Sequence, residues 1–289
     1  MNFETRELTP RIRTAIKANK EELMKGGLSE EIRELLEQSG VLLFRELNMT
    51  DEEQSAFSKT LGEVIPQGPG GIFKITLDPK LNPVADYLHA TYYWHIDGAQ
   101  DDVLTRASLL SARVLSKVGP DRIRQHLCRL WRPARGQEAH GRFAAGGALA
   151  GIHPAGDAPQ SDRSPVGPLA RTSGKGPSHG AWTHRSGRKS LVLGLTAGRI
   201  DGMDTKGGRA IIDEMQAWAT QPQFVYRHHW TVGDMIIWDN TGVMHRVEKY
   251  PEDSGRLLAA LHSSVKRRWS ARRGARPCQK RGNRNLCRT

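Results

Sequence analysis

Two histidines and one aspartate have the types and the spacing that a metal site requires. His95 and Asp97 lie one residue apart in the segment Trp94-His95-Ile96-Asp97-Gly98, and His245 follows far downstream. Side chains at positions i and i+2 of a β-strand point to the same face, so His95 and Asp97 could bind one ion together. Two imidazoles and one carboxylate are the ligand set of non-haem iron(II) oxygenases, which leaves coordination positions open. With His245 as the third ligand, the sequence predicts a facial metal triad.

A His-x-Asp pair is a weak signal by itself, because many strands carry one for ordinary structural reasons. The other candidates are weaker still. The glycines of residues 146–151 follow no expected strand, so they do not indicate a dinucleotide loop. His126 near Cys128 lacks the partner cysteines of a zinc site, and the adjacent His228 and His229 are typical of packing. Tyr93 is a candidate for the wall of a substrate pocket, although an aromatic residue on a buried strand more often belongs to the core.

The elements that must position these residues follow from periodicity and capping signals. Helices are expected at 28–39, with Ser29 as N-cap and Gly40 at the end, and from 51 onward, with Thr50 or Asp51 as N-cap. A third helix is expected at 207–220. Strands are expected at 41–47, 92–97, 107–116, 190–195, 223–230 and 235–240. From 117 to 180 the hydrophobic pattern disappears, so no packed element is expected there, and the tail after Lys266 is expected to be disordered.

The formal net charge of +12 is concentrated in two stretches. Residues 117–180 carry 10 Lys and Arg against 4 Asp and Glu, and residues 266–289 carry 10 against none, which leaves −4 for the remainder. All three cysteines lie in the same stretches: Cys128, Cys278 and Cys287. Their number supports neither a disulfide framework nor a zinc site. The start of the chain has no signal-like apolar region and no stretch suits a membrane span, so we expect a cytoplasmic protein that binds neither membrane nor nucleic acid.

Four ordered motifs resemble the taurine/2,4-D dioxygenase (TauD/TfdA-like) family of iron(II)- and 2-oxoglutarate-dependent enzymes. They are the amino-terminal pair LLEQSGVLLFREL and NMTDEEQ, the metal segment WHIDG, the segment WTHRSGRKSL from Trp182, and the block GDMIIWDNTGVMHRVEKYPEDSGR from Gly233. The resemblance covers residues 1–116 and 181–258. It implies an α+β chain with a mainly β core, a double-stranded β-helix (jelly roll) with flanking helices, formed by a single dioxygenase domain over 1–265. It also implies Fe(II) as cofactor, and 2-oxoglutarate and O2 as cosubstrates.

Arg256 lies eleven residues after His245, and the resemblance implies that it binds the far carboxylate of 2-oxoglutarate. Guanidinium pairs with carboxylate in bidentate geometry and remains charged at any working pH, which suits that role. The ordinary alternative is a surface arginine after a turn. The family also carries a second arginine for the anionic group of taurine- and 2,4-D-type substrates, and Ala260 stands at that position. Taurine is therefore a poor candidate substrate.

Residues 117–180 depart from the family pattern, and we interpret the departure as a slipped reading frame. Read one nucleotide later, Asp121 to Trp131 can spell TEFANTYAAY, which is family-like and restores a threonine that helps hold 2-oxoglutarate. A second slip near Lys266 would explain the arginine-rich tail. The competing interpretation is a genuine flexible lid over the substrate. An intact frame through codons 117 to 180 on resequencing would contradict the slip.

Three functions follow from these patterns. The first is a dioxygenase that hydroxylates a small organic substrate with release of succinate and CO2. The second is a catalytically impaired relative that keeps only the metal triad. The third is a basic nucleic-acid-binding protein, which the local nature of the positive charge disfavours. The sequence does not fix the substrate, and it leaves a homo-oligomer open.

Overall fold

A computed structural model describes residues 4–8, 14–67, 71–99, 105–115, 124–130, 152–154, 181–183, 189–200 and 203–264. Its α-helices are α1 (Lys20–Met24), α2 (Ser29–Ser39), α3 (Asp51–Leu61) and α4 (Thr205–Ala219), and short 3-10 segments are η2 (Ala85–Tyr92), η4 (Gly194–Thr196), η5 (Pro222–Phe224) and η6 (Glu252–Ser254). No helix of this described part is long and apolar enough to cross a membrane.

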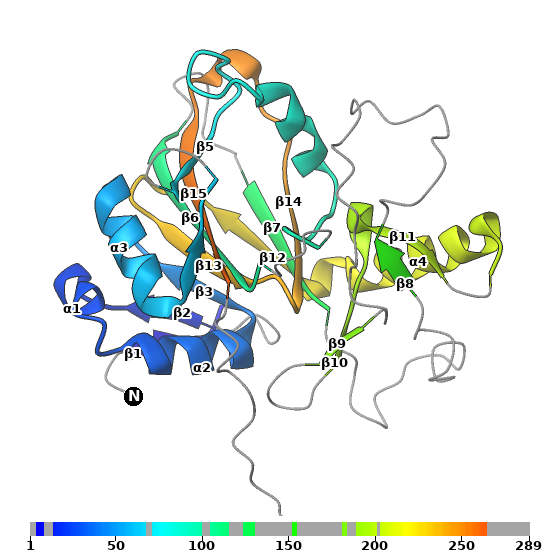
Figure 1. Ribbon diagram of the computed structural model, residues 1–289, viewed down its shortest axis with the longest axis horizontal. Helices are drawn as coiled ribbons and strands as arrows, with labels where there is room; N and C mark the ends of the chain where they lie inside the picture. Colours follow the sequence, from blue (N-terminus) through cyan, green and yellow to red (C-terminus); the bar gives the residue numbers. More distant parts are fainter. Residues whose placement is uncertain are drawn as a thin grey trace, which may run out of the picture.

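Two sheets of unequal size form the centre of the molecule (Figure 1). The large sheet has the order β1-β2-β3-β13-β6-β15-β4, with β5 also paired to β15. Its strands are β1 (Glu4–Arg6), β2 (Thr14–Lys17), β3 (Val41–Phe44), β4 (Glu63–Ile65), β5 (Phe73–Ile75), β6 (Ala107–Val114), β13 (Met235–Asp239) and β15 (Leu257–Ser264). The small sheet has the order β12-β7-β14, from β7 (Arg124–Arg129), β12 (Val225–His229) and β14 (Val243–Val247). Two further pairs join β9 (Ala181–Thr183) to β10 (Lys189–Leu191) and β8 (Ile152–Pro154) to β11 (Ala197–Ile200).

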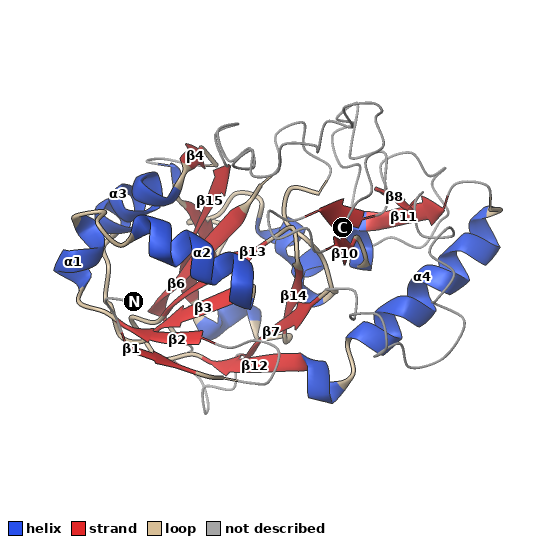
Figure 2. Cartoon of the chain, turned by 90° about the horizontal axis from the view of Figure 1, so that it is seen from below, coloured by secondary structure: helices blue, strands red, loops and turns tan. Residues whose placement is uncertain are grey.

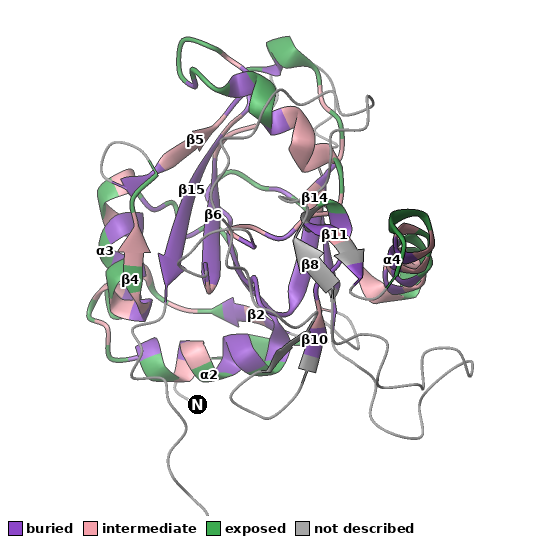
Figure 3. Ribbon diagram, turned by 45° about the vertical axis from the view of Figure 1, so that its right-hand side comes forward, coloured by how far each residue is buried: buried purple, intermediate pink, exposed green. Residues whose placement is uncertain are grey.

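The two sheets and the helices form layers, because successive strand residues point to opposite faces. One face of the large sheet packs against α2 and α3, which Figure 2 shows lying across it. The other face packs against the small sheet, where Leu110 and Trp238 meet Leu127 and Val243. Helix α4 covers the far side of the small sheet through residues such as Met215. The central strands of both sheets are therefore largely buried, while the edge strands are more exposed and the helices keep exposed faces (Figure 3).

Most of the elements expected from the sequence are present. Helix α3 begins with a capping box in which the Thr50 side chain accepts from the Glu53 amide and the Glu53 side chain accepts from the Thr50 amide. The expected N-cap at Ser29 is wrong: Leu28 is the N-cap of α2, and the Ser29 hydroxyl donates instead to the Gly26 carbonyl. The strand expected at 41–47 ends at Phe44, because the backbone turns into the left-handed region at Glu46 and Asn48.

Two further expectations are corrected. The segment 92–97 is not a continuous strand, because η2 extends to Tyr92 and only His95 forms an isolated bridge. Residues 117–180 were expected to hold no packed element, yet β7 is the central strand of the small sheet and β8 pairs with β11. Both partners of β7 supply its backbone hydrogen bonds, and Leu127 and Cys128 are fully buried, so this stretch is part of the core. The rest of that stretch and the tail 266–289 lie outside the described residues.

A buried polar cluster ties the first half of the chain to the second at the edge where β3 and β12 end. The Asp234 carboxylate accepts hydrogen bonds from Arg45 Nη1 at 2.7 Å, His228 Nε2 at 3.1 Å and the Thr231 amide at 2.9 Å. Burial alone would raise the pKa of Asp234, but these hydrogen bonds and the charge of Arg45 together hold it below its usual value. The expectation that His228 serves packing is consistent with this cluster.

Replacing Asp234 with Ala should destabilise the fold by roughly 2 to 4 kcal/mol, because it leaves buried donors without their acceptor. The free energy of unfolding in urea measures the loss. Asp213→Ala is the matched control, since Asp213 pairs with Arg209 on an exposed turn of α4 and such pairs contribute about 0 to 1 kcal/mol.

The difference between Asp234→Ala and the wild type should also depend on pH. Because the folded-state pKa of Asp234 is lowered, its contribution is fully present above the unfolded value of 3.8 and is lost as the pH falls through the folded value. A destabilisation equal to that of Asp213→Ala at pH 7 would show that the cluster does not hold the two halves together.

Candidate metal centre

The three predicted ligands, His95, Asp97 and His245, come together between the two sheets. One ligand atom from each lies within 4.8 Å of the others. Asp97 Oδ1 is 3.6 Å from His95 Nε2 and 3.4 Å from His245 Nε2. Among the described residues, this is the group of three that could hold a metal ion. Residues far apart in the sequence thus form one cluster of nitrogen and oxygen donors.

The backbone fixes the separation of the two histidines. The His95 amide donates to the His245 carbonyl at 3.0 Å, and the His245 amide donates to the His95 carbonyl at 2.9 Å. The backbone of Gly194 lies very close to Trp94, the residue before His95. A Cβ at Gly194 would be only 2.5 Å from the Trp94 carbonyl oxygen, so a larger residue would not fit. Gly194 also has φ +85, which favours glycine. The His95 segment is therefore held by β14 on one side and by η4 on the other.

A backbone carbonyl orients the imidazole of His95. His95 Nδ1 lies 2.8 Å from the Tyr93 carbonyl oxygen, which can only accept, so Nδ1 carries the proton and Nε2 presents a lone pair. Burial, together with the nearby His245, lowers the pKa of His95 to about 4 against the opposing attraction of Asp97. At neutral pH the ring is therefore neutral, which is the form that binds a metal.

Asp97 is the charged member of the group. Burial alone would raise the pKa of its carboxyl, but the attraction and hydrogen bond of His245, with the attraction of His262, hold it well below its usual range. The second oxygen of Asp97, Oδ2, accepts a hydrogen bond from the Ser108 hydroxyl at 2.7 Å. Asp97 is therefore an ionised carboxylate with one oxygen facing the histidines and the other facing β6.

His245 occupies the most enclosed position of the three. Its ring is 4.2 Å from the His95 ring and 4.5 Å from the Trp238 ring, and 4 % of the residue is exposed. It lies on β14, directly opposite Leu127 of β7. Its Nδ1 is buried and finds no hydrogen-bond partner among the described residues. Ring packing and the contact of Nε2 with the Asp97 carboxylate therefore orient this ring.

The donor set fits a divalent metal ion. A neutral imidazole of His95, the carboxylate of Asp97 and the Nε2 of His245 converge with electron pairs on a small volume, where a cation would supply the missing positive charge. These donor atoms suit any first-row divalent metal that binds two imidazoles and a carboxylate. They match the facial ligand set that iron(II) oxygenases use.

Arg256 and Tyr93 lie at different depths. Arg256 directly precedes β15, is 2 % exposed, and stacks its guanidinium carbon 4.5 Å from the centre of the Tyr250 ring. The ordinary alternative of a surface arginine is therefore wrong. Tyr93 is 52 % exposed and lies two residues before His95, so it does not belong to the core. Its assignment to a substrate pocket stays a prediction.

Sequence reasoning missed Ser108 and His262. Both lie on strands of the large sheet, and Ser108 pairs with His262 on one side and with Trp238 on the other. No motif spacing marks them, since only the strand order β13-β6-β15 brings them to Asp97. Once that order is known, the register identifies the residues.

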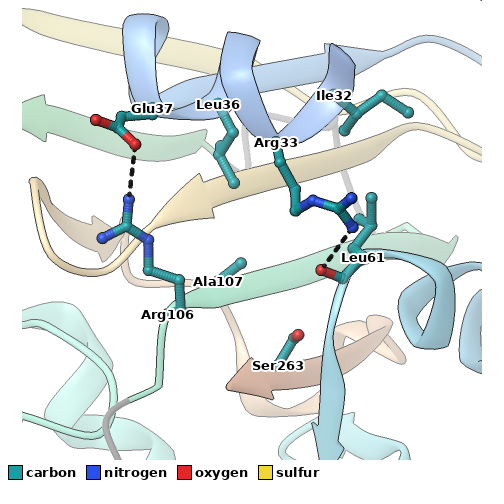
Figure 4. Close-up of a pocket in the computed structure, with 8 residues that line it drawn as sticks. All are labelled: Ile32, Arg33, Leu36, Glu37, Leu61, Arg106, Ala107 and Ser263. Carbon is teal, nitrogen blue, oxygen red and sulfur yellow. Dashed lines mark hydrogen bonds and ion pairs between the residues drawn. The ribbon is translucent and has the colours of Figure 1, made fainter. Parts of the chain in front are cut away.

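A second feature, a small pocket beneath α2, has a structural explanation (Figure 4). Ile32, Leu36 and Ala107 form part of its wall, and Arg106 at its edge lies 3.0 Å from the Asp239 carboxylate. Ala107 and Ser108 are adjacent on β6, so their side chains point to opposite faces of the sheet. The pocket is therefore on the helix side of the large sheet, away from His95, Asp97 and His245.

Comparisons with known proteins agree with the site. The model of the taurine catabolism dioxygenase TauD, TfdA family matches residues 4–262. The alpha-ketoglutarate-dependent 2,4-dichlorophenoxyacetate dioxygenase of Burkholderia sp. (strain RASC) is 31% identical over 277 residues, covering 81% of this chain and 86% of that protein. The enzyme of the same name from Cupriavidus pinatubonensis is 31% identical, covering 79% and 85%. Among solved structures, that of AAD-2 in complex with Mn(II) and N-oxalylglycine has a TM-score of 0.72 at 23% identity, covering 92% of this chain and 98% of that one.

The fold and these relatives define the class of this protein as a 2-oxoglutarate-dependent dioxygenase, an oxidoreductase. The chain belongs to the taurine catabolism dioxygenase TauD, TfdA family. The predicted family and enzyme class are thereby confirmed, and the nucleic-acid alternative is not favoured. The bounds of the family match, residues 4 and 262, lie on either side of the stretch 117–180.

Proposed function

We propose that the chain binds Fe(II) through His95, Asp97 and His245 and hydroxylates a small organic substrate with conversion of 2-oxoglutarate to succinate and CO2. The convergence of the three donor atoms within 4.8 Å is the observation that carries this proposal. When bound, the metal with O2 and 2-oxoglutarate supplies the oxidising power. The protein supplies ligand geometry, a water-poor space between two sheets, and alignment of the substrate.

We further assign Arg256 to the far carboxylate of 2-oxoglutarate. The guanidinium is buried and its carbon lies over the Tyr250 ring, so the side chain is packed in place without a ligand. A planar fork matches a carboxylate with two parallel hydrogen bonds, which a lysine cannot do. Arg256 directly precedes β15, the strand that carries His262 near Asp97. We place Tyr93 at the substrate entrance, because its side chain is half-exposed next to His95. The two packed sheets support a jelly-roll core.

The relatives suggest aryloxy acids as the first substrate class to test, and Ala260 refines that choice. Ala260 lies on β15, is buried and contributes no charge. Burial of a substrate carboxylate against an apolar residue is unfavourable without a charged partner. We therefore infer that an uncharged aryloxy compound is accepted at least as well as the corresponding acid, and that taurine is not accepted.

Succinate release tests this function directly. The protein is supplied with Fe(II), 2-oxoglutarate and one of three probes: 2,4-dichlorophenoxyacetate, its methyl ester, or taurine. We expect iron-dependent succinate above the substrate-free background with the aryloxy compounds, the ester being no worse than the acid, and background release with taurine. Mn(II) binding measured in parallel separates the alternatives. Metal binding without turnover on any probe would indicate the impaired relative, and failure to bind metal would contradict the whole proposal.

A further inference from the structure

The two carboxylate oxygens of Asp97 have different partners. Oδ1 faces His95 Nε2 and His245 Nε2, at 3.6 Å and 3.4 Å. Oδ2 accepts the Ser108 hydroxyl at 2.7 Å. A carboxylate can bind a cation through one oxygen or through both, and the second mode would use a coordination position that the cosubstrate and O2 need. What holds Oδ2 therefore matters to the site.

The direction of the Ser108 hydrogen bond is dictated by a chain of donors that starts at Trp238. The indole Nε1 of Trp238 can only donate, and it lies 3.0 Å from Asn240 Oδ1. The amide of Asn240 is thereby oriented so that its Nδ2 donates to Ser108 Oγ at 2.8 Å. Since Ser108 accepts from Asn240, its single proton is available for another acceptor, and Asp97 Oδ2 at 2.7 Å is that acceptor.

His262 is the third hydrogen-bond partner of the Ser108 hydroxyl. His262 Nδ1 lies 3.3 Å from Ser108 Oγ, and the proton of Ser108 is already given to Asp97, so His262 donates. A hydroxyl has one proton and two acceptor lone pairs. With Asp97, Asn240 and His262 as partners, every hydrogen-bonding position of Ser108 is filled, and the group is buried at 1 % exposure. The hydroxyl cannot turn away without breaking three contacts.

We propose that Ser108 is a positioning residue whose hydrogen bond occupies Oδ2 of Asp97, so that Asp97 binds the metal through Oδ1 alone. This inference rests on the metal site proposed above. The network Trp238–Asn240–Ser108 then acts on two ligands together, because the Trp238 ring also packs against His245. Hydrogen bonds to ligating carboxylates orient them and tune metal affinity. Ser108 thereby keeps the remaining coordination positions of the metal open.

Ser108→Ala and Ser111→Ala form a matched pair that tests the proposal. Ser111 lies on the same strand with the same 1 % exposure but on the opposite face, and its hydroxyl has no hydrogen-bond partner among the described residues. Affinity for Mn(II) is measured by calorimetry without 2-oxoglutarate. We expect Ser108→Ala to bind Mn(II) about 10- to 100-fold more weakly than the wild type, and Ser111→Ala to bind within about twofold.

The visible absorption spectrum of bound Co(II) supplies a readout that a purely structural role would leave unchanged, because it reports the number and arrangement of ligands. We expect it to change in Ser108→Ala and not in Ser111→Ala. If Ser108→Ala does not fold, Ser108→Cys carries the test, since a thiol keeps the shape but donates weakly. Wild-type Mn(II) affinity and an unchanged Co(II) spectrum in the Ser108 variant would overturn the proposal. Failure of the wild type itself to bind Mn(II) would instead contradict the proposed function.

Discussion

Replacing His245 with Ala will abolish metal binding and, with it, iron-dependent succinate release. His245 is the proposed ligand on β14, whereas His95 and Asp97 lie together on a distant segment of the chain, and His245 Nε2 lies 3.4 Å from Asp97 Oδ1. Without it, His95 and Asp97 remain as a two-atom chelate on one segment. Loss of an outer hydrogen-bond partner of a ligand costs roughly 10- to 100-fold in affinity or activity. For a direct ligand we expect a loss on the order of 1000-fold or more in both Mn(II) affinity and turnover.

His229→Ala is the control for this variant. His229 lies on β12 of the same small sheet, but its side chain is exposed. We expect it to retain wild-type Mn(II) affinity and turnover. The thermal unfolding midpoint of each metal-free variant shows whether the fold is intact. Tight Mn(II) binding by a folded His245→Ala variant would mean that the two imidazoles and the carboxylate do not share one ion.

Replacing Arg256 with Lys should raise the concentration of 2-oxoglutarate needed for half-maximal activity by on the order of 100-fold. Lysine keeps the charge but loses the planar fork, so the two parallel hydrogen bonds to a carboxylate are replaced by one point contact. Truncating one partner of a buried charged hydrogen-bonded pair costs roughly 2 to 5 kcal/mol. The measurement is the dependence of succinate release on 2-oxoglutarate concentration at saturating Fe(II).

Two comparisons make the Arg256 result specific. Mn(II) affinity without 2-oxoglutarate should stay within about twofold of the wild type, because Arg256 is not among the three ligand residues. Arg227→Lys, an exposed arginine on β12, should change neither quantity. An unchanged requirement for 2-oxoglutarate in Arg256→Lys would assign this buried guanidinium to the packing around Tyr250 instead.

The sequence could indicate the three candidate metal ligands, because the residue types that bind metals are few. His95, Asp97 and His245 are of types that bind metals, and the motifs around them are specific to a family. The geometry was less accessible. The His-x-Asp pair was expected on a strand, whereas the structure holds it through a single backbone bridge between His95 and His245. An isolated bridge of one residue on each segment leaves no periodic pattern, so hydrophobic periodicity could not reveal it.

The hydrogen-bonding partners of the site could not be predicted for a different reason. Ser108 resembles any serine on a buried strand until β6 is placed between β13 and β15. Likewise, Arg124–Arg129 carries arginine and histidine in place of a clear apolar pattern, yet it forms the centre of the small sheet. Its ladder is made by backbone groups, which pair regardless of side chain. The interpretation of a slipped reading frame remains a prediction, since a strand in this position is compatible with either reading.

The mutual backbone hydrogen bonds of His95 and His245 also bear on how the metal is acquired. Because main-chain atoms already set the spacing of the two imidazoles, little conformational entropy is left to lose when the ion enters. Such a preorganised chelate should bind quickly and with little structural rearrangement, so the metal-free and metal-loaded proteins should share nearly the same amide-exchange protection along β14.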